Sequence, residues 1–144
     1  TLNQHFQGRY KEEEYSIDLV TQISKDKIEV IGLSAFGMRA FTLKYDGENL
    51  DFKNSNFAPN SQKIRPEYML ADMQLFYYPL SEIRKNISPD VAIKEIKKSG
   101  LKRIFYKNNI AFIVISYSSP DIFKSEINYQ NLARNYQFTI QNSY

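Results

Sequence analysis

The sequence predicts an α+β fold, in which a curved, largely antiparallel sheet of about eight strands or more, a half-barrel, wraps around one or two short central helices. Apolar and polar residues alternate as in strands over residues 14–55, apolar residues recur at helical spacing over 67–87, and strand patterns return over 91–142. Runs of strands separated from a helical segment are typical of α+β proteins. A chain of 144 residues can bury one core, so we expect a single domain over residues 1–144.

Alternation along EYSIDLVTQI (14–23) predicts the first strand. Tyr15, Ile17 and Leu19 fall on one face of the extended segment, because successive strand side chains point in opposite directions. Three further segments follow after short turns, at 27–33, 38–45 and 50–55. Loops this short join antiparallel neighbours, so we expect a meander of about four strands.

The middle of the chain predicts helices. After a polar, proline-containing connection over 56–67, YMLADMQLFYY (68–78) has apolar residues at helical spacing. Pro66 suits the start of this helix, and Pro79 ends it and begins a short second helix over 80–87. The apolar stripe of the first helix consists of Met69, Leu70, Met73, Phe76 and Tyr77.

Strand patterns return after Pro89. VAIKEIKKS (91–99) fits either a strand or a helix, whereas LKRIFYK (101–107) and IAFIVISY (110–117) predict a hairpin. Segments 123–131 and 136–142 predict a final pair of strands. With the helices between two groups of about four strands, the order of elements favours a sheet that curls around the helical segment.

Composition excludes several classes of protein. The net charge is +3, but lysines are interspersed with acids, as in SEIRK (81–85), so no basic surface suited to nucleic acid is predicted. The absence of cysteine excludes disulfides, thiolate metal sites and cysteine nucleophiles. No apolar run approaches the roughly 18 to 20 residues that span a bilayer.

Residues with catalytic or metal-binding chemistry are sparse. His5 is the only histidine and lies near a terminus, which argues against a Ser-His-Asp triad. The side chains of the Glu12–Glu14 run diverge to opposite faces of a strand, so no metal site is predicted. We expect neither a metal nor a cofactor.

Asp72 has two interpretations, because it lies within the apolar-rich stretch LADMQL (70–75). It could be a general acid or base whose pKa is raised by burial. The favoured interpretation is that it lies on the polar flank of the helix or pairs with a partner such as Arg39, since an unpaired buried carboxylate is costly. A second carboxylate at the spacing of a glycosidase is missing.

An excess of apolar side chains fits either an ordinary central strand or a hydrophobic binding site, and periodicity does not decide between them. In IAFIVISY (110–117) both faces are apolar, so both must be covered by protein, by a neighbouring molecule or by a ligand. Methionines add adaptable side chains that suit irregular apolar ligands but equally fill core gaps. The candidate lining residues of a pocket between the sheet and the first helix are Leu33, Phe36, Phe41, Leu43, Met69, Met73, Phe76, Phe112 and Val114.

Two stretches, IGLSAFGMRAFTLKYDG (31–47) and PEYMLADMQLFYYP (66–79), carry a family resemblance. Together they resemble an uncharacterised family of predicted bacterial lipoproteins, strongly over the central third of the chain and loosely at Asn128 and Tyr136. The matching residues are Gly32, Leu33, Gly37, Arg39, Phe41, Thr42, Leu43, Tyr45, Asp46, Gly47, Leu70, Ala71, Asp72, Gln74, Leu75 and Pro79.

This resemblance implies a signal peptide that ends in a lipidated cysteine upstream of Thr1, and residence at the periplasmic face of the outer membrane of a Gram-negative cell. Family members tend to be encoded near genes for aryl-polyene or fatty-acid-like lipid synthesis. The order of elements is also similar to that of lipoprotein-localisation carriers and receptors, in which a concave apolar face holds acyl chains beneath a helical lid. The polar residues singled out by the resemblance are Arg39, Asp72 and Gln74.

We therefore expect a monomeric, non-enzymatic lipoprotein domain that binds a lipid, an acyl chain or a lipidated partner, such as a lipoprotein, in an apolar concavity. It is expected to bind no nucleic acid and to reach the membrane through a lipid anchor outside this chain. Two alternatives stay open. One is an enzyme that acts on acyl or polyene lipids with Asp72 and Arg39, and the other is a structural scaffold lipoprotein of a membrane-associated assembly.

Overall fold

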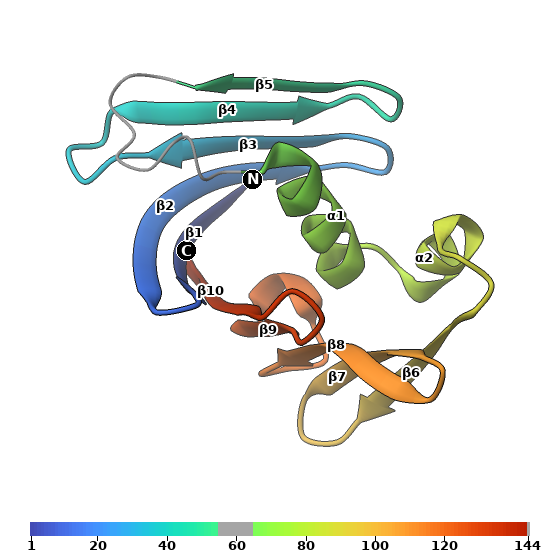
Figure 1. The fold of residues 1–144 in the computed structure, drawn as a ribbon. Coiled ribbons are helices and arrows are strands. Elements are labelled where there is room, and N and C mark those ends of the chain that lie inside the picture. The colour runs from blue at the N-terminus through green and yellow to red at the C-terminus, as the bar shows by residue number, and fades with distance from the viewer. Residues whose placement is uncertain (55–64, 144) are drawn as a thin grey trace.

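A computed structural model describes residues 1–54 and 65–143, and Figure 1 shows that its strands form a strongly curved sheet. Ten strands make one sheet in the order β5-β4-β3-β2-β1-β10-β9-β8-β7-β6, and every neighbouring pair is antiparallel. The strands are β1 (Leu2–Tyr10), β2 (Glu13–Ile23), β3 (Ile28–Leu33), β4 (Arg39–Tyr45), β5 (Leu50–Asn54), β6 (Val91–Lys97), β7 (Leu101–Lys107), β8 (Ile110–Tyr117), β9 (Ile127–Asn131) and β10 (Tyr136–Ser143).

The predicted α+β class is wrong, because the protein is largely β. About 55% of the residues are in strands and 17% in helices, and the sheet is not closed. The sequence pattern missed β1, whose inward-facing positions include Gln4 and Gly8, and left 91–99 undecided between strand and helix, where β6 forms. With these two additional strands, strand residues far outnumber helical ones and the fold is largely β.

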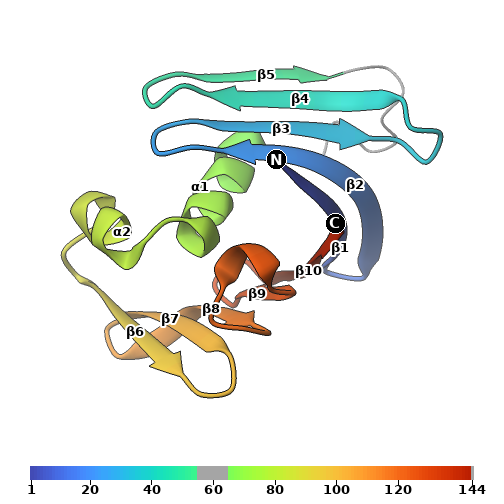
Figure 2. The same ribbon diagram turned by 180° about the vertical axis from the view of Figure 1, so that it is seen from behind.

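Between the edge strands β5 and β6, residues 65–90 form two α-helices. These are α1 (Pro66–Tyr77), which has proline in its first turn as predicted, and α2 (Leu80–Asn86), which begins directly after Pro79. Figures 1 and 2 show α1 on the concave side of the sheet and α2 beside the end that carries β6. Most of the predicted connection over 56–67 lies outside the described residues.

The core lies between the concave face of the sheet and α1. Along β4, for example, Phe41 and Leu43 are fully buried, whereas Lys44 is exposed. From α1, Met73 and Phe76 pack against this face. The buried side chains of the sheet include Leu19, Ile28, Val30, Phe105, Ile113, Ile115, Ile127, Tyr129, Phe138 and Ile140.

Two strands hold the C-terminal end of α1. Arg103 of β7 donates hydrogen bonds to the carbonyl oxygens of Leu75, at 3.0 Å, and Tyr78, at 2.8 Å. The Tyr117 hydroxyl of β8 donates to the Phe76 carbonyl at 2.6 Å. The last carbonyls of a helix have no partner within the helix and carry partial negative charge, so a buried guanidinium there satisfies and stabilises them.

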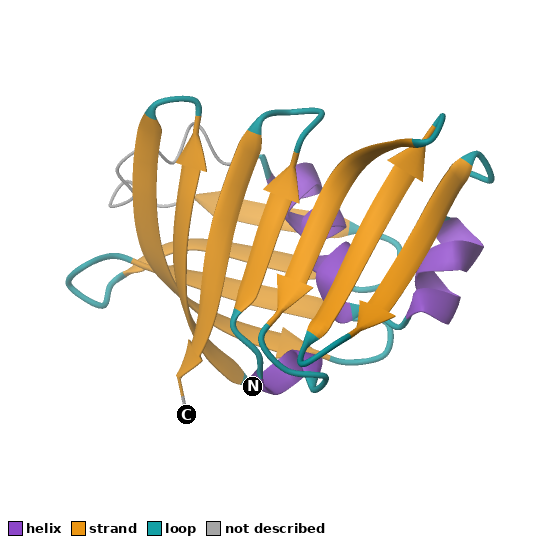
Figure 3. Ribbon diagram, turned by 90° about the horizontal axis from the view of Figure 1, so that it is seen from below, coloured by secondary structure: helices purple, strands orange, loops and turns teal. Residues whose placement is uncertain are grey.

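The two ends of the chain lie beside each other in the middle of the sheet, as Figure 3 shows. β1 pairs with β10 along its length, with Asn3 opposite Ser143 and Tyr10 opposite Tyr136. This seam joins one wing of five consecutive strands, β1–β5, to a second wing, β6–β10. Each helix in the described ranges is too short or too polar to cross a bilayer.

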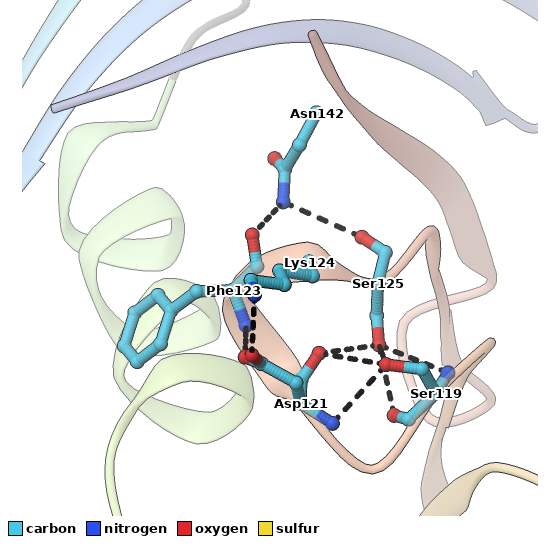
Figure 4. A network of polar contacts seen from close by, with 6 residues as sticks. All are labelled: Ser119, Asp121, Phe123, Lys124, Ser125 and Asn142. Atoms are coloured by element: carbon cyan, nitrogen blue, oxygen red, sulfur yellow. Dashed lines mark hydrogen bonds and ion pairs between the residues drawn. The ribbon is translucent and has the colours of Figure 1, made fainter. Parts of the chain in front are cut away.

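A small polar network fixes the turn of 3-10 helix η2 (Ile122–Lys124) against β10 (Figure 4). The Asp121 carboxylate accepts a hydrogen bond from the Phe123 N–H at 3.1 Å, and the Ser125 hydroxyl lies 2.8 Å from the Asp121 carbonyl oxygen. From β10, the Asn142 amide donates to the Phe123 carbonyl at 2.7 Å. Held in this way, the Phe123 ring stacks on Tyr77 of α1 with ring centroids 5.7 Å apart.

Candidate concave binding site

The candidate site is the apolar concave face beneath α1, and six of the nine predicted lining residues, Phe112 among them, belong to it or pack against it. Phe41, Leu43, Met73 and Phe76 are buried there, and Met69 is half-buried against the same core. Aromatic rings continue this surface towards the seam, where Tyr129 and Phe138 stack with centroids 4.6 Å apart. In this structure the side chains of α1 fill the concave face.

The three remaining predicted lining residues lie away from the concave face. Phe36 lies in the turn between β3 and β4 and is 91% exposed, so it cannot line a pocket. Leu33 follows Gly32, which faces the core, and Val114 lies between the buried Ile113 and Ile115; strand alternation therefore places Leu33 and Val114 on the outer face.

Phe112 belongs with the core for a reason that the sequence did not show. The β7–β8 pairing shifts register next to this residue, and Phe112 is half-buried against the core cluster. Strict alternation along β8 therefore failed at this point, because a register irregularity changes the face that a side chain occupies.

Asp72 is a buried carboxylate of α1. The Tyr136 hydroxyl of β10 donates to one of its carboxylate oxygens at 2.5 Å, and the Tyr129 hydroxyl of β9 donates to the other. The prediction that Asp72 has a partner is confirmed, but its partners are tyrosine hydroxyls and not Arg39, which is an exposed residue at the start of β4. Gln74, the third polar residue of the resemblance, is half-buried and hydrogen-bonds to the Tyr78 side chain.

Burial controls the charge of Asp72. Loss of water raises the pKa of its carboxyl to about 6, although the hydrogen bonds from Tyr129 and Tyr136 and the positive charge of Arg134 oppose the rise. Burial, together with the negative charge of Asp72, also raises the pKa of both tyrosines, which stay protonated donors. The cluster therefore attaches α1 to the two C-terminal strands.

A second polar connection crosses the core from β1 and was missed in the sequence. The Gln4 amide nitrogen contacts the Tyr77 hydroxyl of α1 and donates to the Asn142 side-chain oxygen at 2.9 Å. Gln4 lies between Leu2 and Phe6 in the inward phase of β1, and Thr21 follows Leu19 in the inward phase of β2. Polar residues at apolar positions of a strand pattern are the signal that could have identified them.

His5 lies on the outer face of β1, between two partners on β2. Its Nδ1 is 2.7 Å from the Asp18 carboxylate, and its Nε2 is 3.2 Å from the Ser16 hydroxyl. This is the order of groups in a Ser-His-Asp triad, which the sequence argued against. The side chains of His5 and Asp18 are 41% and 62% exposed, however, and water weakens the electrostatic interactions on which such a triad depends.

The described residues contain no group of three or more His, Cys, Asp or Glu that could hold a metal ion. A hollow of about 680 Å³ lies outside the core, over the strands next to the seam. Its lining is polar, with Gln7, Gln130 and Gln137 among the residues. It is therefore chemically unlike the apolar concave face.

Comparison with known families assigns the chain to one of them. A family model described as "Protein of unknown function (DUF3261)" matches residues 1–143. The chain belongs to the DUF3261 family. Comparison with curated proteins gives no match. The family match covers every strand and α-helix in the described part of this DUF3261 protein, so the two wings of the sheet belong to one family unit.

Several residues that carried the resemblance have structural roles in this DUF3261 chain. A Cβ on Gly32 would lie 2.2 Å from the ring of Phe41, so the glycine lets that ring pack flat on β3. The Asp46 carboxylate accepts hydrogen bonds from the N–H groups of Glu48 and Asn49, and Gly47 has a φ of 101°, as the turn requires. These positions explain the β3–β4–β5 hairpins, whereas Asp72 belongs to the candidate site.

Proposed function

We propose that this protein is a non-enzymatic binding domain that holds a lipid, an acyl chain or a lipidated partner on the concave face of its sheet, beneath α1. The observation that carries the proposal is the open ten-stranded sheet, whose apolar concave face is covered by one helix. Binding sites for apolar ligands are concave, largely apolar surfaces with a few polar groups. Gln4, Thr21 and Asp72 are buried polar groups in this otherwise apolar region.

Ligand entry requires α1 to move, because Met73, Phe76 and Tyr77 occupy the concave face. An acyl chain that takes their place buries methylene groups worth about 0.8 kcal/mol each, and this burial offsets the exposure of the apolar side of the helix. The Asp72–Tyr136 and Gln4–Tyr77 contacts join side chains and can break and re-form as α1 moves. The proposal therefore treats α1 as the element that the ligand displaces.

The proposal includes residence at the periplasmic face of the outer membrane, through a lipid anchor upstream of Thr1. Phe36 supports a membrane location, because its exposed ring lies on a turn that projects beyond the sheet in Figures 1 and 2. The Ser34 and Gly37 N–H groups donate to the carbonyls of Met38 and Ser34, at 2.8 and 2.9 Å, so the turn is hydrogen-bonded within itself. An apolar ring presented in this way can enter the interfacial layer of a bilayer.

Titration of delipidated protein with a fluorescent long-chain fatty acid tests the binding function. We expect saturable binding, displaced by unlabelled tetradecanoate, and a rise in melting temperature. Tyr136→Phe should bind more tightly, because loss of its hydrogen bond to Asp72 raises the population in which α1 is displaced. Tyr10→Phe, an exposed tyrosine on the same face of the neighbouring strand, is the matched control and should not change the affinity.

Absence of saturable binding and of thermal stabilisation in the wild-type protein would contradict the binding function. Two alternative functions remain predictions. One is an enzyme that uses Asp72 and Arg39, and the other is a structural scaffold. The contacts of Asp72 do not favour the enzyme, because both carboxylate oxygens accept hydrogen bonds from tyrosines and are not directed at an open site. A groove or an exposed base would be needed for that chemistry.

A further inference from the structure

Two buried oxygen atoms on the concave face have no hydrogen-bond partner among the described residues. They are the side-chain oxygen of Gln4, in a residue that is 3% exposed, and the hydroxyl of Thr21, in a residue that is 0% exposed. Buried polar atoms are nearly always paired, because each one gives up its hydrogen bonds to water on folding. Two such atoms in one region point to a partner that residues 1–54 and 65–143 do not supply.

Both atoms belong to one patch of the sheet. Gln4 lies opposite Leu19 and Thr21 lies opposite Leu2 in the β1–β2 ladder, so the two residues are diagonal neighbours on the same face. The cross-strand partners Leu19 and Leu2 are apolar, and Tyr77 of α1 contacts the nitrogen of Gln4. The patch therefore lies within the region that α1 covers.

The orientation of the Gln4 amide is fixed by its neighbours. Asn142 uses its side-chain nitrogen to donate to the Phe123 carbonyl, so the Asn142 atom that faces Gln4 is an oxygen and can only accept. Gln4 must therefore present nitrogen to Asn142, and its own oxygen is left to accept from another group. Thr21 adds a hydroxyl, which can donate or accept.

We propose that Gln4 and Thr21 form a polar subsite for a hydroxyl group on the acyl chain of the ligand. A hydroxyl matches the pair, since it can donate to the Gln4 oxygen while accepting from the Thr21 hydroxyl. A saturated, unsubstituted chain leaves both atoms unpaired, and sites built to hydrogen-bond a ligand hydroxyl discriminate strongly against analogues without it. This inference rests on the proposed binding function and names the chemical class of the ligand.

The test compares hydroxylated fatty acids with their unsubstituted parents. Affinities of 3-hydroxytetradecanoate and 12-hydroxyoctadecanoate, and of tetradecanoate and octadecanoate, are measured by displacement of the fluorescent fatty acid. We expect the wild-type protein to prefer at least one hydroxylated chain by about tenfold or more. Thr21→Val, which keeps the shape of the side chain and removes the hydroxyl, should reduce that preference towards one while binding of the parent chain is kept.

Thr21→Ser keeps the hydroxyl and should retain the preference, which separates hydrogen bonding from packing. Thr42→Val is the matched control on the outward phase of β4 and should behave as wild type. If Thr21→Val does not fold, Thr21→Ala serves in its place. Equal affinities of all hydroxylated and parent chains for the wild-type protein would overturn the inference, with the two atoms then satisfied by water, while the binding function would stand. Failure of every chain to bind would overturn both.

Discussion

At the scale of single residues, Asp72 couples the attachment of α1 to pH. Its pKa rises from 3.8 in the unfolded chain to about 6 in the folded protein, chiefly because the carboxyl is buried. The folded state therefore binds the proton more tightly between these two values. Stability from this group is highest below pH 3.8 and falls as pH rises to about 6, above which the charged carboxylate is buried at full cost.

Asp72→Asn removes this dependence, because the amide does not ionise. We expect the free energy of unfolding of the wild type, relative to that of the variant, to fall by up to about 3 kcal/mol from pH 4 to pH 7.5. Urea denaturation at several pH values measures the difference. Asp51→Asn, at an exposed position on β5, is the control; a difference between wild type and Asp72→Asn that does not change with pH would contradict the account.

Phe36 provides a second prediction at this scale. The chain contains no tryptophan, so Phe36→Trp introduces a single tryptophan, which can be excited selectively, in the exposed β3–β4 turn. We expect a blue shift when phospholipid vesicles are added, and quenching by brominated acyl chains, because the ring enters the bilayer. Leu132→Trp, at an apolar residue that is also exposed, should report no change. Equal responses at both positions, or none at either, would contradict a specific membrane contact of the turn.

At the scale of secondary-structure elements, α1 is held at its C-terminal end by Arg103. This buried side chain donates to the carbonyl oxygens of Leu75, in the last turn, and Tyr78, just beyond it, and also pairs with Glu95 of β6, at 3.0 Å. Its removal leaves the carbonyls and the largely buried carboxylate without their donor. Breaking such a partly buried ionic network costs more than the loss of an exposed ion pair.

Arg103→Met is therefore expected to lower the free energy of unfolding by about 2–4 kcal/mol, since the methionine can pack but cannot donate. Lys102→Met, at the adjacent exposed position of β7, should change stability by less than about 0.5 kcal/mol. Urea denaturation gives both values. Equal effects of the two substitutions would show that Arg103 does not anchor the helix.

At the scale of the whole molecule, patterns within single elements were predictable and contacts between distant elements were not. Alternation identified β2 and β10 with their buried faces, and two prolines bounded the helices. β1 was not predicted, because Gln4 and Gly8 interrupt the run of apolar residues at its inward-facing positions. Without β1 the strand order could not be deduced. The tyrosine partners of Asp72 are 57 and 64 residues away along the chain, so no local pattern could reveal them.

The paired ends predict tolerance of circular permutation. β1 and β10 are antiparallel neighbours, about 4.8 Å apart, so about four linker residues can join position 143 to position 2 as a new hairpin. New ends in the exposed β6–β7 turn, between Lys98 and Ser99, should leave a cooperatively folded protein with the same circular dichroism spectrum. New ends between Val114 and Ile115, within β8, should abolish folding; equal outcomes for the two permutants would contradict the role given to the seam.

The position of that seam affects how the chain acquires its fold. Gln4 and Asn142 touch across 138 residues of sequence, so the central strand pair cannot assemble until the last strand has been synthesised. Until then one side of β1 offers free backbone hydrogen-bonding groups beside an apolar surface, which is the kind of edge that recruits other chains. A truncated chain that lacks β10 is therefore expected to aggregate more readily than the complete chain.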